Sequence, residues 1–170
     1  MYERAAALFA DNTGAGKALA MHLEQLLPMI ALYEKAADIT GSREKALAFM
    51  DKWAFIETEK MMEYARALMK LGLYRLMPAM CSWMLDRIFG EAAGFRYCRV
   101  PDAPGFAADM LRCPYVDACA RYGCPELAQF SCRADDITYG ALHPRLIWAR
   151  TQTLGTGGSC CDFHLYVKEK

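Results

Sequence analysis

Residues 146–150 read Leu-Ile-Trp-Ala-Arg, residues 155–158 read Gly-Thr-Gly-Gly, and residues 161–167 read Cys-Asp-Phe-His-Leu-Tyr-Val. The first and last runs are rich in β-branched and aromatic residues, and the glycine-rich run between them is typical of a turn. This stretch predicts a β-rich segment from Leu146 to Leu154, a turn from Gly155 to Ser159 and a closing strand from Cys161 to Val167.

A second hairpin is predicted just upstream. Residues 95–100 have strand character, the run Pro101-Asp102-Ala103-Pro104-Gly105 predicts a turn, and residues 106–112 are expected to return as the partner strand. Between the two hairpins, residues 113–141 predict short helices that are broken at Gly123-Cys124-Pro125.

Residues 1–90 are dominated by Ala, Leu, Met, Glu and Lys, which are good helix formers. We expect helices at Tyr2–Ala10, at Lys17–Asp38 with a kink or split at Pro28, and at Leu76–Phe89. Ser42 is expected to cap a long third helix. That helix carries one apolar stripe at helical spacing: Ala46, Phe49, Met50, Trp53, Ile56, Lys60 and Tyr64.

The pattern as a whole predicts an α+β fold. A helical half (1–90) is followed by a half (91–170) with a small three- or four-stranded antiparallel sheet and inserted short helices. A length of 170 residues is most simply one domain, 1–170.

Composition narrows the function classes. Lys plus Arg and Asp plus Glu both number 20, so no global charge recruits nucleic acid or an anionic membrane. No apolar run approaches the roughly 20 residues that span a bilayer, and Met1-Tyr2-Glu3-Arg4 does not begin a signal peptide. We therefore expect a cytoplasmic protein whose eight cysteines are thiols. Its apolar fraction of 55% hints at a homodimer.

Two motifs give only weak support for a binding site, one for phosphate and one for a metal ion. The run Gly14-Ala15-Gly16-Lys17 lacks the earlier glycine of a phosphate loop, since that position is Asp11, and it lacks the hydroxyl residue after the lysine, which is Ala18. Four cysteines suggest a metal cluster, but their spacing differs from the paired spacing of structural zinc sites, and burial as small apolar side chains explains them equally well. These are Cys113, Cys119, Cys124 and Cys132. We expect no metal and no cofactor, and a thiol-ligated metal protein stays an alternative.

Chemistry-bearing residues gather in the last forty positions. Arg150 shares a strand face with Leu146 and Trp148, so it needs an anionic partner. That partner is either the carboxylate of Asp135, Asp136 or Asp162, which would form an ion pair with Arg150, or the carboxylate of a substrate. The backbone N–H groups of Gly155, Gly157 and Gly158 could also face an anion or a developing oxyanion.

Two cysteines are candidate nucleophiles. Cys161 is the first choice, because Arg150 on the neighbouring strand could favour its thiolate. Alternation places Cys161 and Phe163 on one face and Asp162 and His164 on the other. Cys132 is the second choice: helical spacing brings it to Asp135 and Asp136, which would raise its pKa, and either aspartate could act as a base. His143, beside Pro144, and His164 are each more simply structural, and His22 is structural.

At these residues the chain resembles the L-2-amino-thiazoline-4-carboxylic acid hydrolase family. The resemblance covers about residues 95–167. It lies in Cys113-Pro114-Tyr115, Gly123-Cys124-Pro125-Glu126-Leu127, Phe130-Ser131-Cys132, Asp135-Asp136, Leu142-His143-Pro144, Arg150-Thr151-Gln152-Thr153-Leu154-Gly155, Gly157-Gly158 and Cys161-Asp162-Phe163.

The resemblance implies hydrolysis of a cyclic amidine-like ring. Water adds to the C2 atom of a thiazoline, the ring C–S bond breaks, and N-carbamoyl-cysteine results. The expected partner is a small carboxylate-bearing substrate. The residues expected to contact it are Arg150, Thr153, Gly155, Gly157, Gly158, His143 and Asp162. The alternative is a sensor-like domain that binds a small molecule without turnover.

Overall fold

The computed structural model describes residues 1–169 and has the predicted α+β fold. Its helices are α1 (Tyr2–Asp11), α2 (Lys17–Thr40), α3 (Arg43–Trp53), α4 (Ile56–Met69), α5 (Met77–Ile88), α6 (Pro114–Arg121) and α7 (Ala128–Tyr139). Short 3-10 turns occur at η1 (Leu73–Leu76), η2 (Glu91–Ala93), η3 (Pro125–Leu127) and η4 (Leu154–Thr156). The strands are β1 (Arg96–Arg99), β2 (Phe106–Arg112), β3 (Leu146–Ala149) and β4 (Cys161–Val167).

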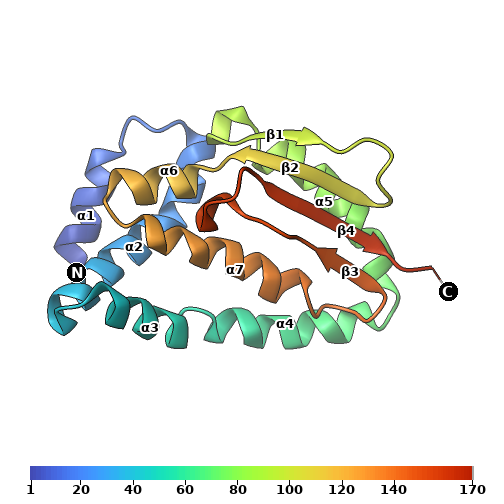
Figure 1. The fold of residues 1–170 in the computed structure, drawn as a ribbon, viewed down its shortest axis with the longest axis horizontal. Helices are drawn as coiled ribbons and strands as arrows, with labels where there is room; N and C mark the ends of the chain where they lie inside the picture. Colours follow the sequence, from blue (N-terminus) through green and yellow to red (C-terminus); the bar gives the residue numbers. More distant parts are fainter. Residues whose placement is uncertain (170) are drawn as a thin grey trace.

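Within residues 1–169, the four strands form one antiparallel sheet in the order β1-β2-β4-β3 (Figure 1). Both predicted hairpins are confirmed. The order also pairs β2 with β4, so that Asp109 lies opposite Asp162. The expected β-rich segment is shorter than predicted, because β3 ends at Ala149 and the chain then enters η4 at Leu154.

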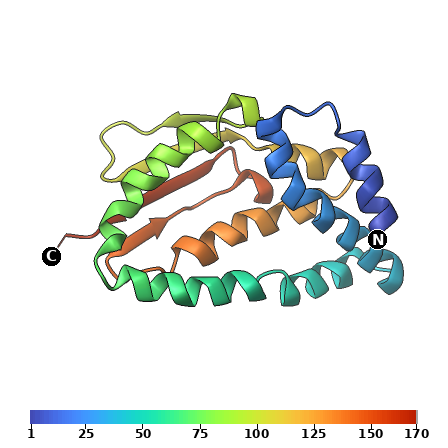
Figure 2. The same ribbon diagram turned by 180° about the vertical axis from the view of Figure 1, so that it is seen from behind.

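One face of the sheet packs against α5, which crosses it in the view from behind (Figure 2). Alternate strand residues make this contact: Phe106, Ala108 and Met110 from β2 share a core cluster with Cys161 and Leu165 from β4. Met77, Cys81 and Leu85 of α5 belong to the same cluster. A second cluster joins α1, α2 and α3 to α6 and α7.

The long third helix of the sequence analysis was a wrong prediction. The chain breaks at Ala54 and Phe55 into α3 and α4, and Phe55 turns inward to stack on Phe130 of α7 with ring centroids 5.8 Å apart. The predicted apolar stripe does not face the core as a whole, since Trp53 is 52% exposed and Tyr64 77% exposed. Burial of one aromatic ring against α7 therefore overrides the helical periodicity.

Two smaller expectations have different outcomes. Ser42 caps α3 as predicted, its hydroxyl accepting the backbone N–H of Lys45 at 3.3 Å. Pro28 lies inside α2 and does not split it. No helix within residues 1–169 combines the length and the apolar character that crossing a membrane requires.

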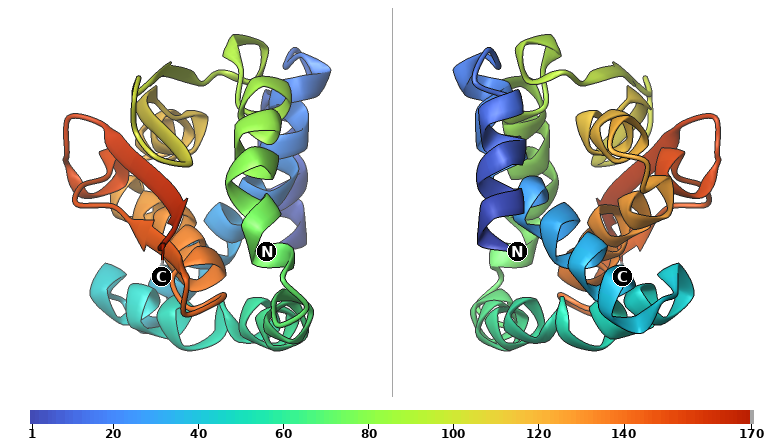
Figure 3. Two further views of the ribbon diagram at one scale, coloured as in Figure 1. Left: turned by 90° about the vertical axis from the view of Figure 1, so that its right-hand side faces the viewer. Right: turned by 90° about the vertical axis from the view of Figure 1, so that its left-hand side faces the viewer.

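The layers enclose the interior of the protein from several sides. Figure 3 places α2 and α5 on one side, the sheet with α6 and α7 on the other, and α3 and α4 along the bottom. The functional side chains lie where α7 meets the connection between β3 and β4.

Candidate active site

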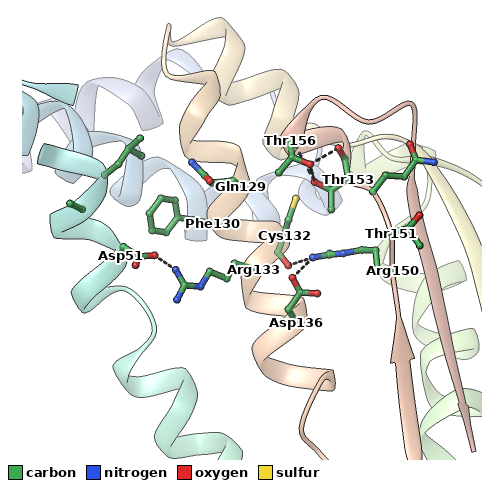
Figure 4. A pocket seen from close by; sticks show the side chains of 13 residues that line it. Asp51, Gln129, Phe130, Cys132, Arg133, Asp136, Arg150, Thr151, Thr153 and Thr156 are labelled. Atoms are coloured by element: carbon green, nitrogen blue, oxygen red, sulfur yellow. Dashed lines mark hydrogen bonds and ion pairs between the residues drawn. The ribbon is translucent and has the colours of Figure 1, made fainter. Parts of the chain in front are cut away.

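Two hollows meet at Cys132. The outer cleft has a volume of about 570 Å³ and opens between α3, α7 and the β3–β4 connection. The inner cavity has a volume of about 440 Å³ and lies between the layers. Cys132 and its neighbour Phe130 line both hollows. The outer cleft is otherwise lined by Leu47, Ala48, Asp51, Gln129, Arg133, Asp136, Arg150, Thr151, Gln152, Thr153 and Thr156, most of which Figure 4 labels.

The structure brings the two candidate cysteines together. Cys132 lies on α7 and Cys161 begins β4, both line the inner cavity, and the interaction between their thiols shifts the two pKa values in opposite directions. The η4 turn supplies one backbone donor to each sulfur. Leu154 donates its N–H to Sγ of Cys161 at 3.2 Å, and the N–H of the next residue, Gly155, helps to lower the pKa of Cys132. The pair is thus held by two successive peptide groups.

Cys132 is the member of the pair whose thiolate is favoured. The hydrogen bond from Cys161, opposed by burial and helped by the Thr153 side chain, Arg150 and the Gly155 N–H, lowers the pKa of Cys132 to about 6. This direction is opposite to the one expected from the neighbouring aspartates alone. The Thr153 hydroxyl accepts the Thr156 N–H at 3.1 Å and lies 2.9 Å from the Thr156 hydroxyl.

Cys161 has the complementary state. Its hydrogen bond to Cys132 and its burial raise the pKa of Cys161, and the Leu154 N–H offsets this only in part. Cys161 therefore stays a thiol and donates its proton toward Cys132. The charge of Arg150 was expected to favour the Cys161 thiolate, but it lowers the pKa of Cys132 instead.

Arg150 ties the β3–β4 connection to α7. Its side chain is 6% exposed, and Nη2 donates to the Cys132 carbonyl at 2.9 Å and to Oδ2 of Asp136 at 2.5 Å. Its Nη1 lies 3.5 Å from Oδ2 of Asp135. Within residues 1–169 this nitrogen has no hydrogen-bond acceptor. Of the partners proposed from the sequence, the structure therefore contains Asp135 and Asp136, and one buried donor is left over.

The two aspartates differ in their surroundings. Asp136 lines the outer cleft and also accepts the Trp148 indole N–H at 2.9 Å. Asp135 lines the inner cavity with its side chain 41% exposed, and the loss of hydration there raises its pKa to about 7, against the opposing charge of Arg150. Asp135 can therefore hold or release a proton near neutral pH, within the same helical turn as Cys132.

Most backbone N–H groups of the glycine-rich turn donate to carbonyl groups within the turn itself. Gly157 donates to the Leu154 carbonyl at 3.2 Å, and Gly158 donates to the Thr153 carbonyl at 2.8 Å. The backbone donors that reach the reactive side chains are those of Leu154 and Gly155. The turn therefore shapes the thiol pair, and binding of an anion by Gly157 and Gly158 stays a prediction.

Asp162 holds the start of the same connection. Its carboxylate accepts the Thr151 N–H at 3.0 Å, the Thr151 hydroxyl at 2.6 Å and the Gln152 N–H at 2.8 Å. These bonds keep the pKa of Asp162 low although burial acts to raise it. Its oxygens are occupied by protein donors, which makes Asp162 a support for the turn.

The histidines lie apart from the thiol pair. His143 stacks on Tyr74 with ring centroids 3.8 Å apart and accepts the Arg145 N–H at 3.1 Å. Nε2 of His164 lies 3.0 Å from the Pro104 carbonyl. His22 is buried, with Nδ1 3.0 Å from the Tyr115 hydroxyl and Nε2 3.0 Å from the Ile88 carbonyl. None of the three lines either hollow among the residues that the structure describes.

The cysteines of the possible metal cluster separate into different environments. Cys119 and Cys124 are buried and joined by the Cys124 N–H, which donates to the Cys119 carbonyl at 2.8 Å, whereas Cys132 lies beside Cys161 at the inner cavity. In the described part of the chain, no group of three or more His, Cys, Asp or Glu side chains is arranged to hold a metal ion.

The sequence did not predict the wall of the outer cleft that α3 and α7 form opposite Arg150. Asp51 of α3 forms an ion pair with Arg133 of α7 there (Figure 4). A helical spacing argument gave no sign of this pair, because it depends on how α3 lies against α7.

One of three comparisons with known proteins found a match. The sequence model of the family described as L-2-amino-thiazoline-4-carboxylic acid hydrolase matches residues 21–165 of the 170-residue chain. Searches of curated proteins and of solved structures each gave no match. The matched range includes Cys132, Asp135, Arg150 and Cys161.

Proposed function

Because this chain belongs to the L-2-amino-thiazoline-4-carboxylic acid hydrolase family, we propose that it is a hydrolase that opens a small cyclic amidine-like ring. One observation carries the proposal. Cys132 lies at the junction of a polar cleft and an apolar cavity, close to Cys161, to the charge of Arg150 and to the Asp135 carboxyl group. A ring that enters the junction meets a nucleophile and a proton donor together.

The reaction begins with Cys132. Its thiolate attacks the C2 atom of the thiazoline and forms a C–S bond, and the electron pair of the C=N bond moves to the ring nitrogen, which takes a proton. The bond from C2 to the ring sulfur then breaks. Asp135 gives its proton to the departing sulfur, which leaves as a free thiol on the substrate. The product of this half is an isothiourea on Cys132.

Water completes the reaction. Asp135, now ionised, takes a proton from water, whose oxygen attacks the same carbon. The bond from carbon to Cys132 breaks and the thiolate is restored. The net change is addition of one water molecule to 2-amino-thiazoline-4-carboxylate to give N-carbamoyl-cysteine.

Arg150 and Cys161 support these steps. Arg150 lines the outer cleft and offers its positive charge to the substrate carboxylate, and the same charge favours the Cys132 thiolate. Cys161 stabilises that thiolate with its own S–H. This assignment makes Cys132 the nucleophile and Cys161 the positioning residue, the reverse of the order proposed from the sequence.

The test is release of free thiol from 2-amino-thiazoline-4-carboxylate. We expect release by the native protein, none by Cys132→Ala, and reduced release by Cys161→Ala. Rapid quenching followed by intact mass measurement is expected to find an adduct of substrate mass on Cys132. Full activity of Cys132→Ala would contradict the nucleophile, and absence of release by the native protein would contradict this substrate.

A second candidate function is supported by the inner cavity, which is lined mainly by apolar side chains. Such a cavity also suits a domain that binds a small molecule without turnover. Copurification of a ligand that raises the melting temperature, without product formation, would favour it.

A further inference from the structure

We infer that the substrate of this protein carries an aromatic or similarly bulky apolar group, and that this group occupies the inner cavity while the reacting carbon lies at Cys132. The inference deepens the proposed function and rests on it, since the position of the reacting carbon follows from Cys132 as nucleophile. It differs in substrate class from the small, polar amino-acid-like ring named in the family description.

The lining of the inner cavity is the first argument. Among residues 1–169, those that line it include no lysine or arginine, and Asp135 is the one acidic side chain. The apolar part comes from every layer: Leu26, Met29, Phe55, Met84, Leu85, Phe89, Phe95, Phe106, Met110, Phe130, Trp148 and Phe163. Arg150 borders the cavity only at the end near Cys132, where its guanidinium lies 5.8 Å from the Trp148 ring and 5.7 Å from the Phe163 ring. A carboxylate placed deeper would lose its hydration without gaining a cation, whereas an apolar group would leave water at no such cost.

The size of the cavity is the second argument. Its volume of about 440 Å³ is separate from the 570 Å³ of the outer cleft. Pockets that enclose drug-sized ligands have volumes of roughly 300–1,000 Å³. One five-membered ring with an amino and a carboxylate substituent fills only a small part of such a space. The side chains around the unfilled part would lack contacts that a larger substrate supplies.

The shape of the wall beside the thiols favours a flat group. The rings of Trp148 and Phe163 are stacked, with centroids 5.4 Å apart and planes at 25°. The Tyr139 ring is tilted against the Trp148 ring, with centroids 5.0 Å apart. These rings share the cavity with Cys161 and Cys132. Aromatic walls bind aromatic groups by stacking or edge contacts.

The two hollows also set the orientation of the substrate. Arg150 and the threonines Thr151, Thr153 and Thr156 line the outer cleft, so the polar end of the substrate faces outward. Cys132 and Phe130 connect the two hollows. A molecule with a polar end, a ring amidine and an apolar end therefore fits in one direction.

The experiment measures binding without turnover. Cys132→Ser protein is titrated by calorimetry with 2-amino-thiazoline-4-carboxylate, with its 5-phenyl derivative and with its 2-benzylamino derivative, which direct a ring from two different positions. We expect at least one derivative to bind about tenfold more tightly than the parent compound, as burial of a phenyl group ordinarily gives. Equal or weaker binding of both derivatives, or no binding of any compound, would overturn the inference.

A matched pair of variants locates the gain. Ala134 lines the inner cavity, whereas Ala67 is exposed on α4. In the Cys132→Ser protein, we expect Ala134→Leu to remove most of the gain from the phenyl group and Ala67→Leu to keep it, with melting temperatures measured for both. A gain that survives Ala134→Leu in a folded protein would place the phenyl group elsewhere and overturn the inference.

Turnover separates this inference from the proposed function. Thiol release from the parent compound, without any gain from the phenyl groups, would leave the hydrolase standing and overturn only the inference. Tight binding of a derivative without thiol release from any compound by the native protein would support the inference about the ligand and overturn the hydrolase.

Discussion

A Cβ atom built at Gly155 would lie 2.8 Å from Sγ of Cys132. It would also lie 3.2 Å from the backbone of Ala128, so the turn and α7 approach each other as closely as a glycine permits. The approach is what lets the Gly155 N–H reach the sulfur. The need for glycine here comes from contact with Cys132 and α7, because its φ is not in the left-handed region.

Gly155→Ala is therefore expected to push the turn away from Cys132. We expect kcat/KM for thiol release to fall by about tenfold or more, since small misplacements of a reacting group are costly. We also expect a loss of about 1–3 kcal/mol in the free energy of unfolding from overpacking. Kinetics and chemical unfolding measure the two effects. Gly16→Ala is the control, because a Cβ there meets open space and its φ is −60°. Unchanged kinetics in Gly155→Ala would contradict the role of the close approach.

The lowered pKa of Cys132 predicts unusual reactivity toward iodoacetamide. A thiol whose pKa is about 6 is mostly ionised at neutral pH, so its alkylation rate should rise through pH 6 and level off above it. Cys98 on β1 is exposed and serves as the reference thiol in the same protein. Cys161→Ala removes the hydrogen bond that contributes most to the shift, so the midpoint should move upward. A midpoint for Cys132 equal to that of Cys98 would contradict the assignment.

The pH profile of kcat/KM should be bell-shaped. Activity should rise through about pH 6 as Cys132 loses its proton, and fall above about pH 7 as Asp135 loses the proton that it gives to the leaving sulfur. Because Cys132 and Asp135 interact, the ionisation of each group affects both the acidic and the alkaline limb of the profile. Asp135→Asn should lower the rate and remove the alkaline limb. An alkaline limb that persists in this variant would mean that another group supplies the proton.

The planar fork of Arg150 predicts that lysine cannot replace it. Nη2 of Arg150 bonds both the Cys132 carbonyl and Asp136, and Nη1 lies 3.5 Å from Oδ2 of Asp135, whereas a lysine has one nitrogen and cannot occupy both positions. Arg150→Lys should therefore reduce kcat/KM by about tenfold or more and raise the midpoint of Cys132 alkylation. Arg99→Lys, which alters an exposed ion pair with Asp86, is the control and should keep native kinetics. Native kinetics in Arg150→Lys would contradict both proposed roles of Arg150, binding of the substrate carboxylate and stabilisation of the Cys132 thiolate.

The sequence predicted the parts of the fold that depend on neighbours along the chain. The turn between residues 101 and 105 and the alternation of residues 161–167 are local signals, and β2 and β4 have the predicted bounds. The pairing of Asp109 with Asp162 was not predictable in this way, since it joins two hairpins. The break at Phe55 also depends on Phe130, which lies on a distant helix.

The candidate site, like the fold, was predictable only in the features that depend on neighbours along the chain. Its residue types could be recognised because Cys132, Arg150 and Cys161 lie in one short part of the sequence. Their chemical states could not, because the pKa of Cys132 depends on hydrogen bonds from Cys161 and Gly155 across the α7–turn contact. Helical spacing alone places only the aspartates beside Cys132 and so predicts a shift of the opposite sign.

Asp162 should support stability more than chemistry. Its carboxylate accepts the N–H and the hydroxyl of Thr151 and the N–H of Gln152, and bonds to a charged acceptor are worth about 1.5–3 kcal/mol. Asp162→Ala should lower the free energy of unfolding by about 2 kcal/mol at neutral pH. The pKa of the folded state is lowered, so this contribution exists above the unfolded pKa of about 3.9 and is lost as pH falls through the folded value. The difference between the native protein and Asp162→Ala should therefore shrink in acid.

The register partner of Asp162 provides the control for that measurement. Asp109 lies directly opposite on β2, so the two carboxylates repel each other across the strands. Asp109→Ala should leave the free energy of unfolding unchanged or slightly higher, measured in urea at neutral pH. An equal loss in both variants would mean that strand propensity, and not the hold on Thr151 and Gln152, explains the effect. A difference between them that stays constant down to pH 2 would contradict the carboxylate as its source, because protonation must abolish a charge-assisted acceptor.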